Sequence, residues 1–264
     1  MTQYPDQYQA LLQLGDGEFL KPNKPISLRL YPKHAFKDEK EISVYFAPLE
    51  WVNSNAKIVF VGITPGESQM RAAWRETRQA LRCGVPVEQA MSEVKRLCAF
   101  NDERNQMRPN LYAQIEHWGI HSFLGYRSGE SLFHEGWGDV QTSSVLPYPT
   151  FLNDENYNGK SPPLMEHQEL KYFVLNKFVP IINAIPDAIL FPLGPAVEAV
   201  VRYLYSRKLI SNPCAYGMLH PSGNNNYRIK YLCGSRTDPL PHATSSKAYD
   251  AGRAAFQSQY LKAK

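Results

Sequence analysis

The chain has 264 residues, of which 43% are hydrophobic and 20% charged; this excludes a disordered protein and is enough apolar material for a substantial buried core. The formal charge of +4 permits a nucleic-acid partner but does not demand one. The longest apolar region, around residues 178–201, is interrupted by prolines and an aspartate, and the N-terminus shows no signal-peptide pattern. We expect a cytoplasmic protein with no membrane partner.

The four cysteines, at positions 83, 98, 214 and 233, form no CxxC pair. A zinc or iron–sulfur site therefore lacks its usual ligand spacing. A reducing cytosol also disfavours structural disulfides. We expect neither a metal nor a redox cofactor.

The first fifty residues are polar and interrupted by prolines, with one candidate strand at 41–46. We expect residues 1–50 to be an extension packed on one domain, residues 51–264. Hydrophobic periodicity and helix signals in that domain predict, in order, strand 57–62, helix 65–81, helix 86–99, strand 140–146, loop 147–163, helix 165–183, strand 188–193, helix 194–205, strand 213–219 and helix 248–261. This alternation predicts an α/β fold, three-layer α/β/α, with a short, mainly parallel central sheet.

A tight turn, Gly62-Ile63-Thr64-Pro65-Gly66, follows the first strand of this domain. Glycine and proline at these places let the backbone approach a ligand, and free amides at a helix start favour negative charge. The same residues also suit a plain helix start, because Thr64 as N-cap and Glu67 three residues later form a capping box.

A second polar turn, His220-Pro221-Ser222-Gly223-Asn224-Asn225-Asn226-Tyr227-Arg228, follows the strand predicted at 213–219. The carboxyl ends of parallel strands meet at one edge of an α/β sheet, where such folds place their chemistry. His220 by itself is more typical of a satisfied histidine at a strand end, and Gly-Asn-Asn-Asn is ordinary turn chemistry.

Taken together, the two turns resemble the active-site motifs of the uracil-DNA glycosylase superfamily. The second turn matches the family's H-P-S-P-L-S-V-Y-R in length and at both ends, and the first stands in the place of its G-x-D/N-P or G-E-A-P-G turn. The resemblance implies a uracil-DNA glycosylase-like fold, DNA as the partner, no cofactor, and a monofunctional N-glycosylase. It covers roughly residues 55–260 in topology but only about thirty positions in motif detail.

The resemblance also implies catalytic roles. His220 hydrogen-bonds the base oxygen that becomes negative as the glycosidic bond breaks, which lowers the barrier by preferential transition-state binding. Thr64 stands where the family has the acid or amide that holds the attacking water. Because a hydroxyl is no general base near neutral pH, either the reaction relies on leaving-group stabilisation or Glu67 supplies a carboxylate. Gly66 replaces a tyrosine that excludes C5 substituents, which leaves room for a larger base.

Base and DNA contacts follow from the same resemblance. Ser143 falls, to within one residue, where the family has a base-reading asparagine, and one hydroxyl reads fewer base atoms than an amide. Tyr148 and Phe151 are candidates for stacking on the extruded base, although an aromatic in such a loop more often packs beneath it. Asn224 replaces a leucine wedge, so duplex insertion relies on a poorer side chain or on Tyr227. The candidate base-binding residues are Gly62, Ile63, Gly66, Ser143 and Tyr148, and the candidate DNA-binding residues are Ser222, Gly223, Asn224, Asn225, Tyr227, Arg228, Arg71 and Arg75.

Four arginines, at positions 71, 75, 78 and 82, recur on one side of the predicted helix 65–81 and just beyond it. Such a stripe neutralises phosphates of a nearby nucleic-acid backbone, or it is an ordinary solvated face.

The sequence therefore predicts a hydrolase that flips out a modified or damaged pyrimidine and cuts its N-glycosidic bond, leaving an abasic site. The enlarged pocket points to a bulky modified cytosine, such as one of phage DNA attacked in antiviral defence. A uracil-repair glycosylase is the alternative within this class. The alternatives outside it are a non-catalytic DNA-binding relative, suggested by the missing acid at Thr64, and an enzyme that processes free nucleotides or nucleosides.

Overall fold

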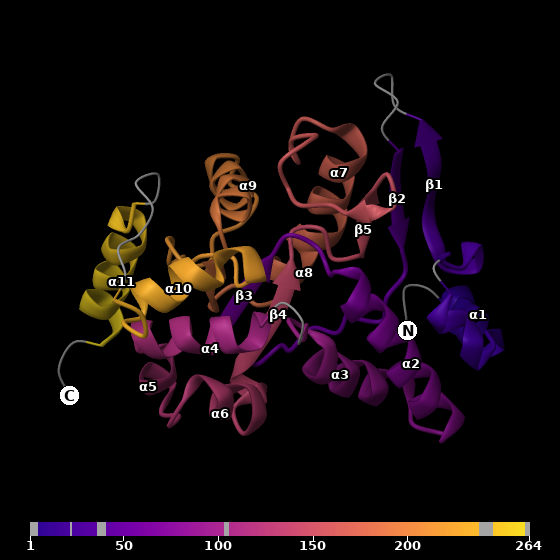
Figure 1. Ribbon diagram of the computed structural model, residues 1–264, viewed down its shortest axis with the longest axis horizontal. Coiled ribbons are helices and arrows are strands. Elements are labelled where there is room, and N and C mark those ends of the chain that lie inside the picture. The colour runs from indigo at the N-terminus through magenta and orange to yellow at the C-terminus, as the bar shows by residue number, and fades with distance from the viewer. Residues whose placement is uncertain (1–4, 22, 36–40, 103–105, 238–244, 262–264) are drawn as a thin grey trace. The chain divides into compact units, whose positions relative to one another are not determined.

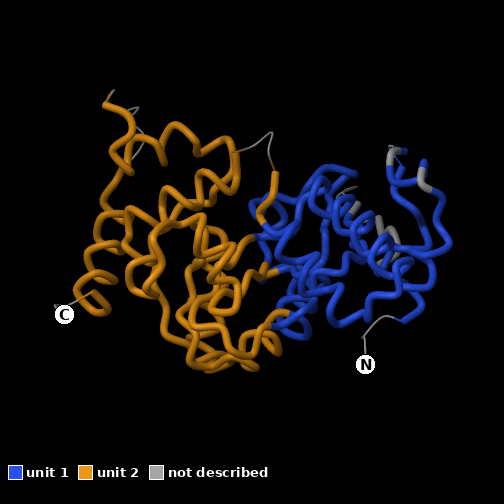
Figure 2. The backbone as a smooth tube through the Cα atoms, turned by 90° about the horizontal axis from the view of Figure 1, so that it is seen from below, with its two compact units in different colours: residues 1–52, 63–99, 146–177 blue, residues 53–62, 100–145, 178–264 orange. Residues whose placement is uncertain are grey.

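The computed structural model describes residues 5–21, 23–35, 41–102, 106–237 and 245–261. The chain forms two compact units: unit 1 comprises residues 1–52, 63–99 and 146–177, and unit 2 comprises residues 53–62, 100–145 and 178–264 (Figure 2). The predicted extension, residues 1–50, thus lies in unit 1, and the predicted domain is divided between the two units. Within the described residues, no helix has both the length and the apolar character needed to cross a membrane.

Unit 1 contains an antiparallel sheet of order β1-β2-β5-β6. Its strands are β1 (Arg29–Ala35), β2 (Glu41–Tyr45), β5 (Thr150–Leu152) and β6 (Glu155–Asn156). The candidate strand at 41–46 is confirmed by β2. The prediction of a loop at 147–163 is wrong where β5 and β6 form, because strands of two or three residues leave no readable alternation in the sequence.

The helices of unit 1 are α1 (Pro5–Gln13), α2 (Glu67–Arg82), α3 (Val87–Cys98) and α7 (Gln168–Phe173), with short 3₁₀ turns at Asp16–Leu20 and Ile26–Leu28. Helices α2 and α3 were both predicted, and α2 starts two residues later than expected. The helices enclose an apolar core around Trp74, which is fully buried and donates its Nε1 proton to the Phe46 carbonyl at 2.7 Å.

Unit 2 is built on a parallel sheet of order β4-β3-β7, formed by β3 (Ile58–Gly62), β4 (Val140–Ser144) and β7 (Ile189–Pro192). All three strands were predicted. The prediction of a strand at 213–219 is wrong. This segment forms a single isolated bridge to β7, between Cys214 and Leu190. Pro213 has no amide proton, and Gly217 adopts a positive φ of 116°, so a regular ladder cannot continue along this segment.

Helices surround this sheet (Figure 1): α4 (Met107–Trp118), α5 (Ile120–Leu124), α6 (Gly129–His134), α8 (Val179–Asn183), α9 (Pro195–Ser206), α10 (Asn226–Leu232) and α11 (Lys247–Tyr260). Single 3₁₀ turns lie at Trp137–Asp139 and Gly223–Asn225, and a π-helical stretch, Val174–Phe178, separates α7 from α8 in the chain. The expected helix 165–183 is therefore present from Gln168 onward. Helices α4, α5, α6 and α10 were not predicted.

The core of unit 2 is aromatic. Phe60 and Phe191 are neighbours in register on one face of the sheet, with ring centroids 5.5 Å apart. Three helices, α4, α6 and α11, cover that face with Trp118, Phe133 and Phe256. Val59, which alternates to the opposite face, is also fully buried. The fold is therefore mixed α/β, with a small parallel sheet flanked by helices.

Candidate active site

The carboxyl ends of the three parallel strands meet at one edge of the unit 2 sheet. Gly62 pairs with Ser144 in register, and Val61 pairs with Pro192. Just beyond β7, the amide of Gly194 donates to the carbonyl of Met218 at 2.9 Å. This contact brings the segment that leads into His220 to the same edge as the ends of β3 and β4.

The imidazole of His220 has a defined tautomer. Its Nδ1 accepts the backbone proton of Ser222 at 3.3 Å, so a neutral ring carries its proton on Nε2. Burial lowers the pKa of His220 to about 4, and the ring is therefore uncharged at neutral pH. In the described part of the chain Nε2 makes no hydrogen bond, so this atom is a donor available to a ligand.

Two glycines fix the backbone around His220. Gly194 has a φ of +90°, and a Cβ placed on it would lie 3.2 Å from the Cβ of His220 and 3.3 Å from its nitrogen. On α11, a Cβ on Gly252 would lie only 1.9 Å from the carbonyl oxygen of Tyr216. Helix α11 therefore packs directly against the segment that precedes His220, and both positions require glycine.

Two amide side chains that the sequence analysis did not single out also contact this segment. Gln114 accepts from the amide of Leu219 at 2.8 Å and donates to its carbonyl at 3.1 Å. Asn110 donates to the carbonyl of Pro221 at 3.0 Å. Their spacing of four residues places both amides on one face of α4, but this helix was not predicted, so no signal in the sequence linked them to His220.

The turn after His220, which was predicted to bind DNA, is helical. Gly223–Asn225 form a 3₁₀ turn that leads into α10, with Ser222 at its start. Asn224 and Arg228 are exposed, whereas Tyr227 is partly buried with a guanidinium group, that of Arg236, 4.1 Å from its ring centroid. The polar turn expected here is thus ordered by local hydrogen bonds, including one from Asn225 Nδ2 to the His220 carbonyl at 2.9 Å.

Ser143, the candidate base reader, is partly buried near the end of β4, as is its neighbour Ser144. Successive strand residues point to opposite faces of the sheet. A Cβ on Gly62 would lie 3.5 Å from the Ser144 hydroxyl and 3.3 Å from the Phe100 ring, so Ser144 shares the face of Gly62 and Ser143 occupies the other face.

The remainder of the first motif belongs to unit 1. Ile63 and Gly66 are partly buried, and the Ile63 carbonyl accepts the amide of Leu146 at 2.9 Å. The hydroxyl of Thr64 donates to the carbonyl of Tyr148 at 2.9 Å and accepts from the amide of Thr150 at 3.0 Å. Thr64 therefore braces the turn before β5.

The capping box predicted for this turn is wrong. Helix α2 starts at Glu67 with Gly66 as N-cap, and no side chain of the turn caps it. The first amide is capped instead from β6, where Asn156 Oδ1 accepts the Glu67 proton at 2.9 Å. Thr64 cannot fill this role because its hydroxyl is bonded to Tyr148 and to Thr150, the first residue of β5.

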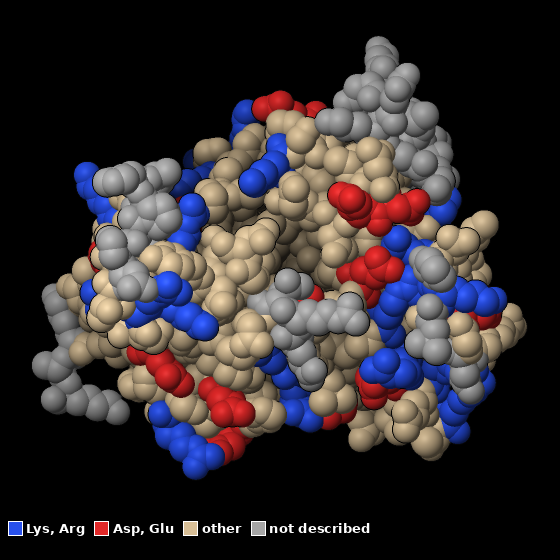
Figure 3. Space-filling model, in the orientation of Figure 1, with Lys and Arg blue, Asp and Glu red and all other residues tan. Residues whose placement is uncertain are grey.

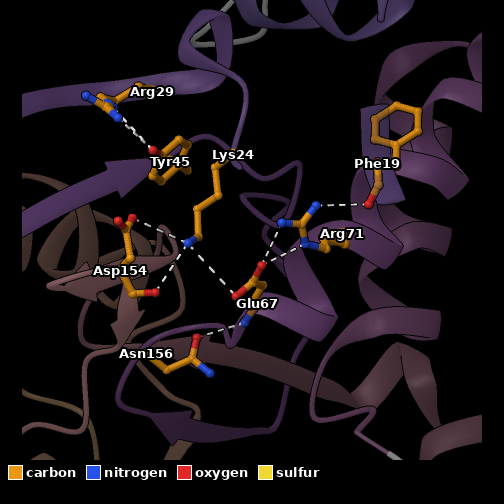
Figure 4. Close-up of polar contacts among 8 residues, drawn as sticks. All are labelled: Phe19, Lys24, Arg29, Tyr45, Glu67, Arg71, Asp154 and Asn156. Atoms are coloured by element: carbon orange, nitrogen blue, oxygen red, sulfur yellow. Dashed lines mark hydrogen bonds and ion pairs between the residues drawn. The ribbon is translucent and has the colours of Figure 1, made fainter. Parts of the chain in front are cut away.

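Glu67 holds two cations in unit 1 (Figure 4). Its carboxylate is 2.7 Å from Arg71 Nη2 and 3.9 Å from Lys24 Nζ. Arg71 also donates to the carbonyl of Phe19 at 2.9 Å. Glu67 and Arg71, both predicted site residues, therefore form ion pairs and a backbone hydrogen bond around the start of α2.

Tyr148 and Phe151 pack beneath the loop. Of the two alternatives considered for these rings, stacking on a base or packing under the loop, the structure shows the second. The Tyr148 ring is buried, and its hydroxyl donates to Glu50 at 3.0 Å. Phe151 is fully buried, with the Lys24 ammonium 4.1 Å from its ring centroid. Neither ring can stack on a base without leaving this packing.

Comparison with known proteins places the chain in a family. No protein-family model matches it, and no solved structure matches it. The uncharacterized protein YoxB of Bacillus subtilis strain 168 is 33% identical over 195 residues, which are 73% of this chain and 75% of YoxB. The chain belongs to the YoxB family.

One face of α2 in this YoxB-family chain is strongly basic, and Figure 3 shows Lys and Arg side chains gathered over the region of this helix. Arg75, Arg78 and Arg82 line a pocket of about 270 Å³ together with Gln79 and Cys83. Arg75 is exposed and pairs with Glu76 at 3.1 Å. Of the predicted stripe, Arg75 and Arg82 are thus exposed, Arg78 is buried with its guanidinium over the Phe19 ring, and Arg71 turns toward Glu67.

Proposed function

We propose that this member of the YoxB family is a DNA N-glycosylase with a uracil-DNA glycosylase-like fold, which flips out a modified or damaged pyrimidine and hydrolyses its N-glycosidic bond. The observation that supports this proposal most is the state of His220. A neutral imidazole at the carboxyl edge of a parallel sheet presents an Nε2 proton that no described residue accepts.

The chemistry follows from that donor. When the C1′–N1 bond breaks, its electron pair stays with the base, which leaves as an anion, and the sugar becomes oxocarbenium-like. The Nε2–H of His220 donates to the base oxygen that gains charge, and a fixed donor of this kind is worth about 3 kcal/mol. Water then adds to C1′ and loses a proton to solvent, and the departed base anion takes up a proton from solvent, which gives the neutral free base and an abasic site.

The resemblance assigns the attacking water to Thr64 or Glu67. The Thr64 hydroxyl already donates one hydrogen bond and accepts another, and the Glu67 carboxylate is paired with Arg71. These contacts favour a reaction that depends mainly on stabilising the leaving base, because an oxocarbenium-like sugar needs little help from a general base. The water-holding roles of both residues stay predictions.

We propose a bulky C5-modified cytosine, of the kind found in phage DNA, as the substrate, and hence a role in antiviral defence. Gly66 stands in place of the tyrosine that excludes C5 substituents, and a Cβ there would have only an ordinary contact, 3.7 Å from Asn156. No close contact therefore requires glycine at this position. Uracil repair is the alternative substrate choice.

A substrate panel tests the proposal. Excess enzyme is incubated with duplex and single-stranded oligonucleotides that contain one uracil, one deaminated purine or one glucosylated cytosine, and abasic sites are then revealed by alkaline cleavage. We expect cleavage at the glucosylated cytosine. Release of uracil alone would overturn the enlarged-pocket proposal, and no cleavage of any oligonucleotide would overturn the enzyme assignment.

A non-catalytic DNA-binding relative is the second candidate, favoured by the engagement of Thr64 and Glu67 within unit 1. This candidate predicts DNA binding without cleavage in the same panel. A nucleotide-processing enzyme would instead bind free nucleotides in preference to oligonucleotides, which a competition experiment with labelled DNA measures.

A further inference from the structure

Side-chain amides hold the backbone on both sides of His220. Gln114 is fully buried and pairs with both the amide and the carbonyl of Leu219, at 2.8 and 3.1 Å. Asn110, 4% exposed and one helical turn away on α4, donates to the carbonyl of Pro221 at 3.0 Å. Residues four apart lie on one face of a helix. One face of α4 therefore hydrogen-bonds to the backbone both before and after His220.

The hydrogen bonds from α4 take the place of the backbone hydrogen bonds that a strand before His220 would have made. The segment before His220 forms only a single bridge to β7, so the polar backbone groups of Leu219 have no sheet ladder to satisfy them. An unpaired buried amide or carbonyl costs about 1–3 kcal/mol. Gln114 supplies both partners from a buried helix face, where an apolar side chain would otherwise be expected.

The arrangement extends across three consecutive residues. The carbonyls at positions 219, 220 and 221 each accept a proton from a different side-chain amide, those of Gln114, Asn225 and Asn110. The amide of Ser222 then donates to the ring itself, at Nδ1. The backbone on either side of His220 is thus fixed by contacts that leave Nε2 unused.

We propose that Gln114 and Asn110 are positioning residues that hold the His220 imidazole in its Nε2–H tautomer, directed at the departing base. The inference rests on the proposed function for its catalytic part. Neither amide needs to touch the substrate, because each acts through the main chain beside His220. A displacement of about 1 Å at a reacting group costs roughly 10²-fold in rate, which sets the expected scale of the effect.

Nitrogen NMR of the ¹⁵N-histidine-labelled full chain tests the positioning without any assay of activity. The chain has seven histidines, and the signals of His220 are those missing from the His220→Ala spectrum. We expect the wild type to show a neutral Nε2–H ring near pH 7. Gln114→Met, of similar length but without donor or acceptor, should give a mixture of both tautomers. Asn53→Ala is the matched control, since its amide also donates to buried carbonyls of unit 2, those of Trp137 and Val140, at the opposite end of β4.

Kinetics provide the second readout. For Gln114→Met we expect kcat to fall by about 10- to 100-fold with KM changed less than about threefold, whereas Asn53→Ala keeps the wild-type kcat. If Gln114→Met does not fold, Asn110→Ala, which removes a single bond, gives the same comparison. A His220 tautomer and kcat unchanged in a folded variant would overturn the inference. A wild type that forms no abasic sites would overturn the proposed function, and the NMR comparison would still decide the positioning role.

Discussion

The backbone of Gly194 lies directly against His220. We predict that Gly194→Ala destabilises the protein and lowers the excision rate, because the new Cβ meets His220 at 3.2–3.3 Å and the φ of +90° is strained for alanine. Gly125→Ala is the control: Gly125 has a φ of +85° but open space around its Cβ. Urea unfolding should give a loss for Gly125→Ala of about 1 kcal/mol and a larger one for Gly194→Ala. Equal losses with unchanged excision would contradict the contact.

The ionisation of His220 predicts a pH dependence of stability. Its folded pKa of about 4 lies below the ordinary value of 6.5, so the unfolded chain binds more protons between these values. The stability contributed by the neutral ring is therefore complete above pH 6.5 and is lost as the pH falls through 4. Urea unfolding of the wild type and of His220→Gln at several pH values measures this. The stability difference between them should shrink or reverse on acidification, and a constant difference would be evidence against a neutral His220 ring.

At the scale of elements, the sequence was most informative where a periodic apolar pattern is long. Strands β3, β4 and β7 and helices α2, α3, α9 and α11 were all predicted within a few residues, because each buries a clear stripe or run. Helices α5 and α6 have five and six residues, which is too short for a periodic signal. The start of α2 was misplaced because its cap, Asn156, is 89 residues away in sequence.

That distant cap can be tested. Asn156→Ala should reduce the free energy of unfolding by about 1 kcal/mol, since the Glu67 amide loses its acceptor at the start of α2. Asn158 is the matched control, because among the described residues its side chain accepts only the amide of Lys160, in an exposed loop. Asn158→Ala should change stability by less than about 0.5 kcal/mol. Chemical denaturation of both variants distinguishes them, and a neutral Asn156→Ala would show that the cap is dispensable.

The exposed arginines of α2 are predicted to contribute to DNA binding. Replacing Arg75 and Arg82 with glutamine should weaken DNA binding and reduce the slope of log K against log salt by up to about 2, as expected for two lost phosphate contacts. Arg127→Gln is the control, since Arg127 is an exposed arginine of unit 2 paired with Glu135. Fluorescence anisotropy across a salt series measures both. An unchanged slope for the double variant would identify the face as simply solvated.

At the scale of the whole molecule, the division into two units was not visible in the sequence. Local periodicity reports elements, whereas each unit is assembled from three separate stretches of chain by contacts between distant residues. The candidate site shows the same limit. The motifs identified His220 and the strand ends, but not the amides of Asn110 and Gln114, whose importance appears only once α4 is folded against the His220 segment.

The central claim is that His220 stabilises a departing base. The most direct measurement is the single-turnover rate of abasic-site formation by the wild type and by His220→Ala on the same oligonucleotide, with DNA binding measured in parallel. We predict a rate loss of about 10²- to 10³-fold, as for removal of one oxyanion donor, with affinity for DNA largely retained. Equal rates for the two proteins, or no abasic sites from either, would contradict the account.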